Sequence, residues 1–248
     1  MARAAGRQTG RGGRGPLGFW MRLCVIVVRP VTRLMFRFSW GGQQHLPPTG
    51  GVILVVNHVS LLDPFTVARF TWDAGRIPRF MIKESLFGVF FIGAALRGAR
   101  QIRVRRGTNA ANTALRAAEG ALEDGEAVVV YPEGTVTRDP DWWPMLGKTG
   151  LARLWLATGV PVIPMAQWGQ QRAWDYHSGR LRLFPRKKVV VVAGAPVDLS
   201  RFRGRPLTPE LLREITDAAF SAVRDLVAVE RGEAAPDAFF VGGDRAAS

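Results

Sequence analysis

Short runs of β-branched residues alternate with helical segments along most of the chain, and this alternation limits the possible folds more than any other feature. The runs that we interpret as strands cover 52–57, 78–82, 101–104, 127–131, 161–166 and 187–193. Segments with the spacing of helices lie near 64–72, 85–97, 108–124, 148–158 and 209–230. Strands that alternate with helices pack as a sheet covered by helices, so the sequence predicts an α/β fold with a mixed sheet.

Both ends of the chain differ in composition from this alternating part. Residues 1–16 are rich in arginine and glycine, so we expect a disordered basic arm, and the lack of aromatic residues between its arginines disfavours RNA binding. Residues 232–248 are rich in alanine, glycine and aspartate and predict a flexible tail. Between these ends we expect a helical segment, 17–44, and one globular domain, 45–231, because 248 residues of which 47% are hydrophobic suffice for one core.

Residues 17–40 fit a helix with a basic side and an apolar side, at about 100° per residue. The basic side carries Arg22, Arg29, Arg33 and Arg37, and the apolar side carries Trp20, Leu23, Val27, Val31, Leu34, Met35 and Phe38. Pro30 is expected to kink or split this helix. The pattern is typical of a helix that lies in a membrane interface, so we interpret 17–44 as an amphipathic membrane anchor. The alternative is a helix packed on the domain with solvated arginines.

The charge of the chain points to anionic partners. It has 34 basic and 20 acidic residues, a formal net charge of +14, which favours phospholipid headgroups, nucleic acid or phosphorylated substrates. Cys24 is the single cysteine, which excludes an internal disulfide and suits a reducing compartment. No apolar run approaches the length of about 20 residues that a spanning helix needs. The basic start lacks the apolar stretch of a secretory signal, so we expect no export.

The stretch NHVSLLDP, residues 57–64, concentrates polar side chains directly after a predicted strand. In one interpretation Ser60 and Asp63 form a capping box, although Pro64 disfavours a helical backbone at Asp63. In the other, the Asp63 carboxylate fixes the tautomer of His58, whose second ring nitrogen then takes a proton from a hydroxyl. A Ser-His-Asp triad within this stretch is disfavoured, because Ser60 is too close in sequence to His58. The spacing leaves the capping box and the His58–Asp63 pair open.

Three further stretches follow or contain predicted strands. VVVYPEGTVTRD, 128–139, places Glu133 at a turn, where a solvated glutamate is the simplest interpretation. IRVRRG, 102–107, carries three arginines, which are either solvated or recognise phosphate. VPVIPMAQWG, 160–169, has no titratable group and is expected to be plain core.

In this order, these stretches resemble the motifs of the lysophosphatidic acid acyltransferase family (PlsC type), glycerolipid acyltransferases recognised by an N-H-x4-D motif. NHVSLLDP matches the first motif, KESLF at 83–87 with QIRVRRG at 101–107 resembles the second, and YPEGT matches the third. GVPVIP at 159–164 resembles the fourth, and GKTG at 147–150 fits the segment before it. The resemblance covers about residues 45–200. It departs from the family pattern at Arg105, where an acidic residue is common, and at Val136-Thr137, where the family often continues EGTRS.

The resemblance implies transfer of a fatty acyl group from a thioester, acyl-CoA or acyl-carrier protein, to the free hydroxyl of a lysophospholipid. His58 is then the general base on that hydroxyl, oriented by Asp63, with direct attack on the thioester and no covalent enzyme intermediate. No metal or organic cofactor is needed. The implied substrate-binding residues are Arg106, on the acceptor phosphate, together with Lys83, Glu133, Gly134 and Thr135.

The acceptor that we expect is 1-acylglycerol 3-phosphate, which gives phosphatidic acid. The alternatives are the same chemistry on another lysophospholipid or on a glycolipid, and, more remotely, a non-catalytic basic protein that binds membranes or nucleic acid. The last alternative leaves the His58, Asp63 and Glu133 motifs as coincidence. We therefore expect a peripheral or monotopic enzyme on the cytoplasmic face of the cell membrane, with an anionic membrane surface and no nucleic acid among its partners.

Overall fold

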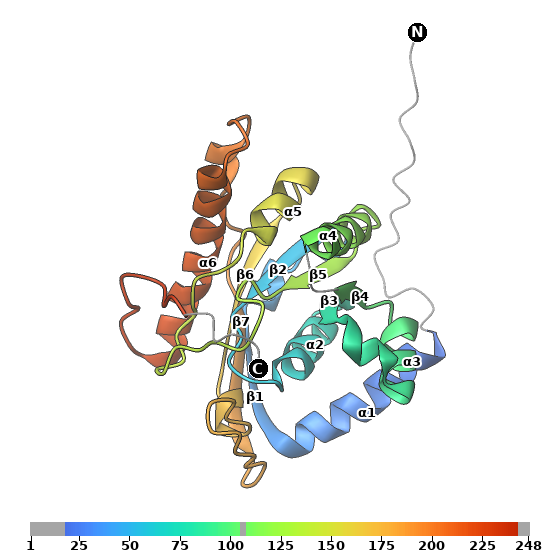
Figure 1. The fold of residues 1–248 in the computed structure, drawn as a ribbon. Helices are drawn as coiled ribbons and strands as arrows, with labels where there is room; N and C mark the ends of the chain where they lie inside the picture. Colours follow the sequence, from blue (N-terminus) through green and yellow to red (C-terminus); the bar gives the residue numbers. More distant parts are fainter. Residues whose placement is uncertain (1–17, 105–107, 243–248) are drawn as a thin grey trace.

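The computed structural model describes residues 18–104 and 108–242, and it describes only the backbone of residues 108–111. In this part of the chain, a seven-stranded sheet is covered by helices (Figure 1). The strand order is β1-β7-β6-β2-β5-β3-β4, and neighbouring strands are parallel except β6 and β7. The predicted α/β fold with a mixed sheet is confirmed.

The six predicted strands are present with small shifts at their ends, and so are the predicted helices near 64–72, 108–124, 148–158 and 209–230. The helix predicted at 85–97 is divided into a 3-10 turn, 84–88, and a helix, 90–98. The strands are β1 Phe36–Gly41, β2 Val52–Val56, β3 Pro78–Lys83, β4 Ile102–Val104, β5 Ala127–Val130, β6 Val162–Trp168 and β7 Lys187–Ala193. The helices are α1 Phe19–Met35, α2 Asp63–Asp73, α3 Phe90–Gly98, α4 Thr108–Glu123, α5 Gly150–Thr158 and α6 Pro209–Arg231. Four short 3-10 turns are η1 Gln43–His45, η2 Glu84–Gly88, η3 Gln170–Arg172 and η4 Ser200–Phe202.

The strand β1 was not predicted. The prediction of one helix through residue 40 is wrong, because α1 ends at Met35 and the chain continues as a strand that pairs with β7, Phe36 opposite Lys187. From Phe36 on, apolar and polar residues alternate with the period of two that fits a half-buried strand. The sheet therefore begins within the segment 17–44, before the predicted domain boundary. Nor is α1 split at Pro30, where Arg69 of α2 donates to the Arg29 carbonyl at 3.1 Å and holds the helix against α2.

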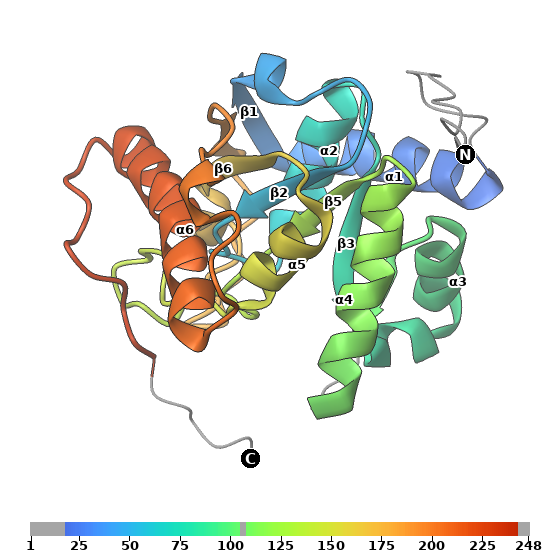
Figure 2. The same ribbon diagram turned by 90° about the horizontal axis from the view of Figure 1, so that it is seen from above.

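Two apolar layers lie on the two faces of the sheet. On one face, α4, α5 and α6 pack against β2, β5 and β6, and on the other face α2 packs against the same part of the sheet (Figure 2). Both sides of the central strand β2 are therefore buried, as its continuous apolar sequence requires. The helix α1 follows the second face and lies beside α2 and α3 (Figure 1).

The described residues after α6 contact the domain through two aromatic residues. In the described part of the predicted flexible tail, the Phe239 ring stacks on Phe220 of α6 at 5.4 Å between centroids. The Phe240 carbonyl accepts a hydrogen bond from the Leu146 N–H at 2.9 Å. These contacts attach residues 239 and 240 to the domain, and the flexibility of 232–248 stays a prediction.

The carboxyl ends of β2, β5, β3 and β6 lie at one edge of the sheet, because these strands run parallel. The segment after β2, which begins with Asn57 and His58, lies between the segments after β5 and β6. Ligands of open α/β sheets bind at this edge. The fold therefore brings the first and third sequence motifs together beside the end of β6, whereas the fourth motif, 159–164, lies at the other end of that strand.

Candidate active site

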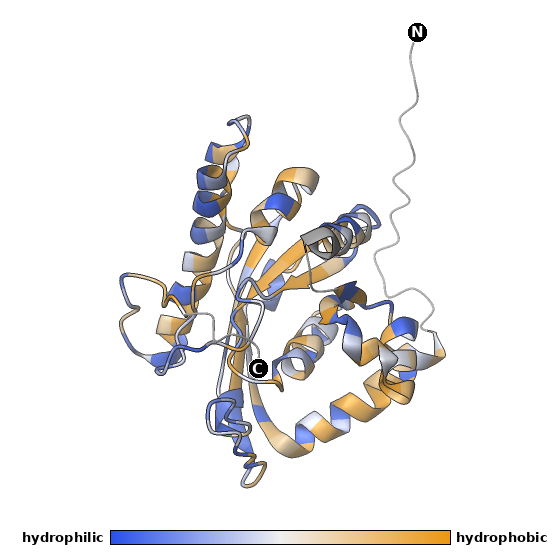
Figure 3. Ribbon diagram, in the orientation of Figure 1, coloured by the Kyte–Doolittle hydropathy of each residue, from blue (hydrophilic) through white to orange (hydrophobic). Residues whose placement is uncertain are grey.

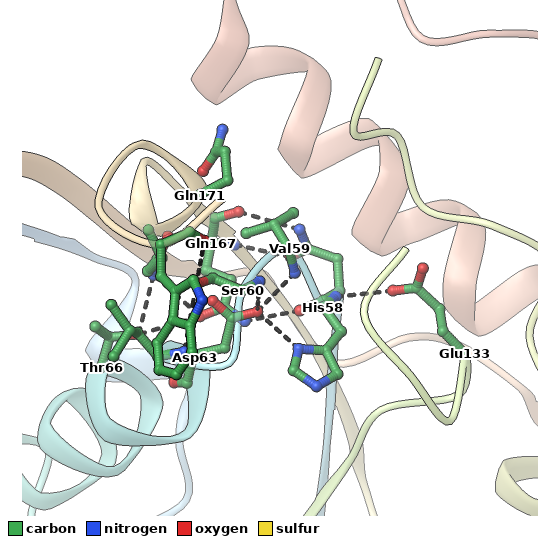
Figure 4. Close-up of polar contacts among 12 residues, drawn as sticks. His58, Val59, Ser60, Asp63, Thr66, Glu133, Gln167 and Gln171 are labelled. Carbon is green, nitrogen blue, oxygen red and sulfur yellow. Dashed lines mark hydrogen bonds and ion pairs between the residues drawn. The ribbon is translucent and has the colours of Figure 1, made fainter. Parts of the chain in front are cut away.

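His58 and Asp63 form a hydrogen-bonded pair in the turn between β2 and α2. The Nδ1 of His58 lies 2.8 Å from the Oδ2 of Asp63. The same oxygen accepts hydrogen bonds from the backbone N–H groups of Val59 at 2.6 Å and Ser60 at 2.9 Å (Figure 4). The Asp63 side chain is 0% exposed and the His58 side chain 14% exposed, so the carboxylate is enclosed while part of the imidazole reaches solvent.

The turn also has one half of a capping box. The Ser60 N–H donates to the Asp63 carboxylate, but the Ser60 hydroxyl donates to the Trp174 carbonyl at 2.9 Å instead of accepting from the Asp63 N–H. Helix α2 begins at Asp63, so the expectation that Pro64 disfavours helical backbone there is wrong. Proline is tolerated in the first turn of a helix because its missing N–H would have no partner there. One carboxylate thus binds both the backbone of the turn before α2 and the ring of His58.

Burial and hydrogen bonding act on the Asp63 carboxyl in opposite directions. Burial raises its pKa above the ordinary value, while the hydrogen bond and charge of His58 and the backbone N–H groups of Ser60 and Val59 lower it. When Asp63 is ionised, it accepts a proton-bearing Nδ1, and the Nε2 of His58 is then left unprotonated. The geometry is that of a general base with its orienting carboxylate.

Glu133 holds the backbone of His58 from the segment after β5. Its Oε1 accepts the His58 N–H at 2.8 Å, and its Oε2 accepts the Met145 N–H at 3.1 Å. The residue is 2% exposed, so the interpretation as a solvated glutamate is wrong. Burial raises the pKa of Glu133 to about 8. In the same segment, the Thr137 N–H donates to the His58 carbonyl at 2.7 Å, so both backbone groups of His58 are fixed by one loop.

Asn57 fixes the turn on its other side. Its side-chain NH2 donates to the Gln167 carbonyl at 3.0 Å, and its Oδ1 accepts the Gln167 N–H at 2.9 Å. The Gln167 amide group in turn donates to the Asn57 carbonyl at 2.7 Å, and its oxygen accepts from Thr66 and Gln170 (Figure 4). The stretch 160–169 is buried as predicted, but it is not plain core. The sequence feature that could have indicated this is Gln167, a glutamine within an apolar run, because a buried side-chain amide requires hydrogen-bond partners.

Tyr131 was not singled out from the sequence. Its ring stacks on the His58 ring, with 4.5 Å between centroids and an interplanar angle of 28°. Burial and the nearby Asp63 carboxyl raise the pKa of the Tyr131 hydroxyl well above its ordinary value, so the ring stays neutral. The sequence feature that could have indicated this role is the position of Tyr131, directly after β5 and directly before the P-E-G-T motif.

Three other predicted site residues, Lys83, Gly134 and Thr135, lie along the same sheet edge. Gly134, with a φ of +71°, and Thr135 continue the turn after Glu133. Lys83 ends β3 and is exposed; two strand spacings, about 10 Å, separate β3 from β2. Arg106 and its neighbour Arg105 lie outside the described residues. The third arginine of that stretch, Arg103, lies 3.6 Å from the carboxylate of Glu84.

Among the described residues, no three His, Cys, Asp or Glu side chains gather in a way that could hold a metal ion.

A family model described as Acyltransferase matches residues 37–168, which is more than half of the chain. The chain belongs to the acyltransferase family. The matched residues of this acyltransferase include His58, Asp63 and Glu133 and end at the last residue of β6.

Individual relatives agree with this assignment. A 1-acyl-sn-glycerol-3-phosphate acyltransferase of Borreliella burgdorferi is 27% identical over 50% of this chain and 48% of its own. One of Limnanthes douglasii is 29% identical over 54% of this chain and 46% of its own. The acyltransferase thus spans about half the length of these relatives. The crystal structure of the 1-acyl-sn-glycerophosphate (LPA) acyltransferase PlsC from Thermotoga maritima superposes with a TM-score of 0.63 at 22% identity, covering 87% of this chain and 81% of that one, which shows a shared fold.

Proposed function

We propose that this acyltransferase moves a fatty acyl group from acyl-CoA or acyl-carrier protein to the free hydroxyl of 1-acylglycerol 3-phosphate and so forms phosphatidic acid. The His58–Asp63 pair, 2.8 Å apart at the end of the central strand, carries the proposal. A base oriented in this way suits a reaction whose difficult step is the removal of a proton from a hydroxyl. The names of the relatives support the choice of acceptor.

The reaction requires His58 to hold one proton for a short time. Its Nε2 takes the proton of the acceptor hydroxyl while that oxygen attacks the thioester carbonyl carbon. The new C–O bond forms, the C–S bond then breaks, and the departing thiolate receives the proton from His58. Asp63 stays ionised throughout and stabilises the imidazolium.

Binding of the acceptor phosphate is assigned to Arg106, which follows β4 in the sequence, together with Lys83, Gly134 and Thr135. The ammonium group of Lys148 lies close to the turn at Gly134. If Gly134 had a side chain, its Cβ would lie 3.3 Å from the Nζ of Lys148. Lys148 is exposed and belongs to the GKTG stretch. Glu133 contributes by fixing the backbone of the turn, since both of its oxygens accept backbone N–H groups.

Contact with a membrane is assigned to α1 together with η2 and α3. The helices α1 and α3 are packed together, since the ring of Trp20 fills the space that a side chain at Gly98 would need. No helix in the described residues is long and apolar enough to cross a bilayer. Hydrophobic residues are nevertheless frequent along α1 (Figure 3). The exposed apolar residues are Phe19, Leu23, Ile26, Val27, Val31 and Leu34 on α1, and Leu86, Val89, Phe90, Phe91 and Ile92 on η2, α3 and the residue between them. We infer a peripheral enzyme on the cytoplasmic face, because both substrates carry chains that partition into the bilayer.

A thiol-release assay tests this function. Free CoA should appear from acyl-CoA only when the acceptor is added, and 1-acylglycerol 3-phosphate should be the best substrate of a panel that includes other lysophospholipids and a glycolipid. Replacement of acyl-CoA by acyl-carrier protein in the same assay identifies the donor. Release that does not depend on any acceptor would overturn the proposal.

A further inference from the structure

The connection between β6 and β7 carries a cluster of charge that the proposed reaction does not use. We call residues 172–186 the β6–β7 loop. It projects from the sheet at the same end of the molecule as α1, at the bottom of Figure 1. It also lies beyond residue 168, where the match to the family model ends.

The β6–β7 loop combines positive charge with exposed apolar side chains. Its basic residues are Arg172, Arg180, Arg182 and Arg186, and its one acid is Asp175. The Asp175 carboxylate binds within the loop. It accepts hydrogen bonds from the N–H groups of His177 and Ser178 and from the Ser178 hydroxyl. In the described part of the chain, none of the four arginines forms an ion pair. The exposed apolar residues are Tyr176 (42%), Leu181 (55%) and Phe184 (66%).

The loop is joined to the C-terminal end of α1. The Arg186 guanidinium donates to the Phe36 carbonyl at 2.6 Å, and Phe36 follows the last residue of α1 directly. Phe36 also pairs with Lys187, the first residue after the loop. The last residue of the β6–β7 loop therefore lies beside the end of α1.

The loop is also joined to the active site. Near its start, the Trp174 carbonyl accepts the Ser60 hydroxyl at 2.9 Å. Further along, the Nε2 of His177 lies 2.9 Å from the carbonyl of Thr137, whose own N–H binds the His58 carbonyl. A surface that binds this loop thus lies close to the turn that carries the catalytic pair.

We propose that the β6–β7 loop is a second membrane contact, in which its arginines bind the headgroups of an anionic bilayer and Leu181 and Phe184 enter the interface beside α1. The inference rests on the proposed function, in which the acceptor comes from a bilayer. An acidic protein partner would account for the arginines but not for the exposed apolar residues. These residues and the position of the loop beside the end of α1 favour a lipid surface. Two contacts instead of one fix how the enzyme lies on the bilayer, with the His58 turn held beside the headgroups.

The test is cosedimentation of the full chain with vesicles of phosphatidylcholine, with and without phosphatidylglycerol. The variant is Arg180→Glu with Arg182→Glu, and the matched control is Arg116→Glu with Arg153→Glu, which makes the same change of charge on α4 and α5 at the opposite end of Figure 1. Each basic group lost near an anionic surface weakens binding about fivefold, so the loop variant should bind phosphatidylglycerol vesicles at least about 25-fold more weakly than wild type. The control variant should lose much less of its affinity for these vesicles. Leu181→Ser with Phe184→Ser should remove the part of the binding that survives high salt.

Turnover of a soluble short-chain acceptor separates this inference from the proposed function. If the loop variant loses vesicle binding and keeps this turnover, both stand. If neither the wild type nor any variant transfers acyl groups, but the loop variant still loses vesicle binding, the proposed function is wrong and the membrane contact stands. Equal vesicle binding by the loop variant and the control overturns the contact. Unchanged vesicle binding with a selective loss of turnover from acyl-carrier protein also overturns it, in favour of an acidic protein partner.

Discussion

The backbone N–H of His58 donates to the Oε1 of Glu133 at 2.8 Å, so a buried carboxylate from the segment after β5 positions the histidine that follows β2. The second oxygen of Glu133 binds the Met145 N–H at 3.1 Å, which ties a third segment to the same side chain. We therefore propose that Glu133 acts on the reaction through the backbone that it holds.

Glu133→Gln should lower kcat and leave both KM values nearly unchanged. The glutamine has one acceptor oxygen in place of two, so one buried N–H group loses its partner at a cost of about 1–3 kcal/mol in stability. A displaced His58 slows proton transfer without removing a contact to either substrate. Asp139→Asn is the control, since Asp139 lies in the same loop and, among the described residues, its side chain accepts the N–H groups of Asp141 and Trp143. An increase in the acceptor KM at constant kcat would mean that Glu133 binds substrate directly.

The raised pKa of Glu133 predicts a pH dependence of stability. Between its ordinary value of 4.5 and about 8, the folded state binds one more proton than the unfolded state. The free energy of unfolding of the wild type therefore falls as the pH rises through this window, by up to about 1.4 kcal/mol per pH unit, and levels off above it. Glu133→Gln lacks this contribution, so the difference between the two proteins in urea unfolding should decrease with pH. A difference that is constant from about pH 5 to pH 9 would contradict the assigned pKa.

The order of strands and helices could be predicted because each has its own local signal. Buried strands such as Val52–Val56 are uniformly apolar, and the helices between them keep their own spacing. The strand β1 was missed because Arg37 and Phe38 also fit the faces of a helix, and only pairing with β7, 150 residues away at Phe36 and Arg186, decides between the two. Local periodicity does not report such distant partners.

The site could be predicted only where the chemistry is local. His58 and Asp63 are close in sequence, so their pairing is visible in the motif. The amide pair of Asn57 and Gln167 joins residues 110 positions apart, and the stack of Tyr131 on His58 depends on which strands are neighbours in the sheet. Those contacts follow from the topology and not from any one stretch of sequence.

Arg106→Ala should increase the KM for 1-acylglycerol 3-phosphate far more than the KM for the acyl donor. The change removes a charge-assisted hydrogen bond to the acceptor phosphate, which the donor does not share. Steady-state kinetics with each substrate varied in turn measures the effect, and Arg105→Ala, the adjacent basic residue, is expected to be milder. An equal increase for both substrates would indicate a structural arginine.

The exposed apolar residues of α1 can be tested without removing the helix. Deletion of residues 1–40 should destabilise the fold, because it removes most of β1 and the fully buried Phe36. Ile26→Ser with Leu34→Ser changes two exposed side chains instead, and should weaken vesicle binding in a way that added salt does not reproduce.

The matched control for α1 is Val229→Ser with Leu207→Ser, two exposed apolar residues on α6 and in the segment before it. It should leave vesicle binding as in the wild type. If the α1 variant also binds as the wild type does, the membrane contact of α1 is refuted, and the exposed residues of η2 and α3 become the next to be changed.

The rate of acyl transfer by His58→Ala tests the central claim most directly. The variant should keep the thermal stability of the wild type to within a few degrees, since the His58 side chain forms one hydrogen bond and one ring stack at the edge of the core. Loss of a general base should reduce acceptor-dependent thiol release about 10²–10⁴-fold. A folded His58→Ala protein that releases thiol at nearly the wild-type rate would contradict the assignment of His58 as the base, and would leave Asp63 with the backbone of the turn as its partner.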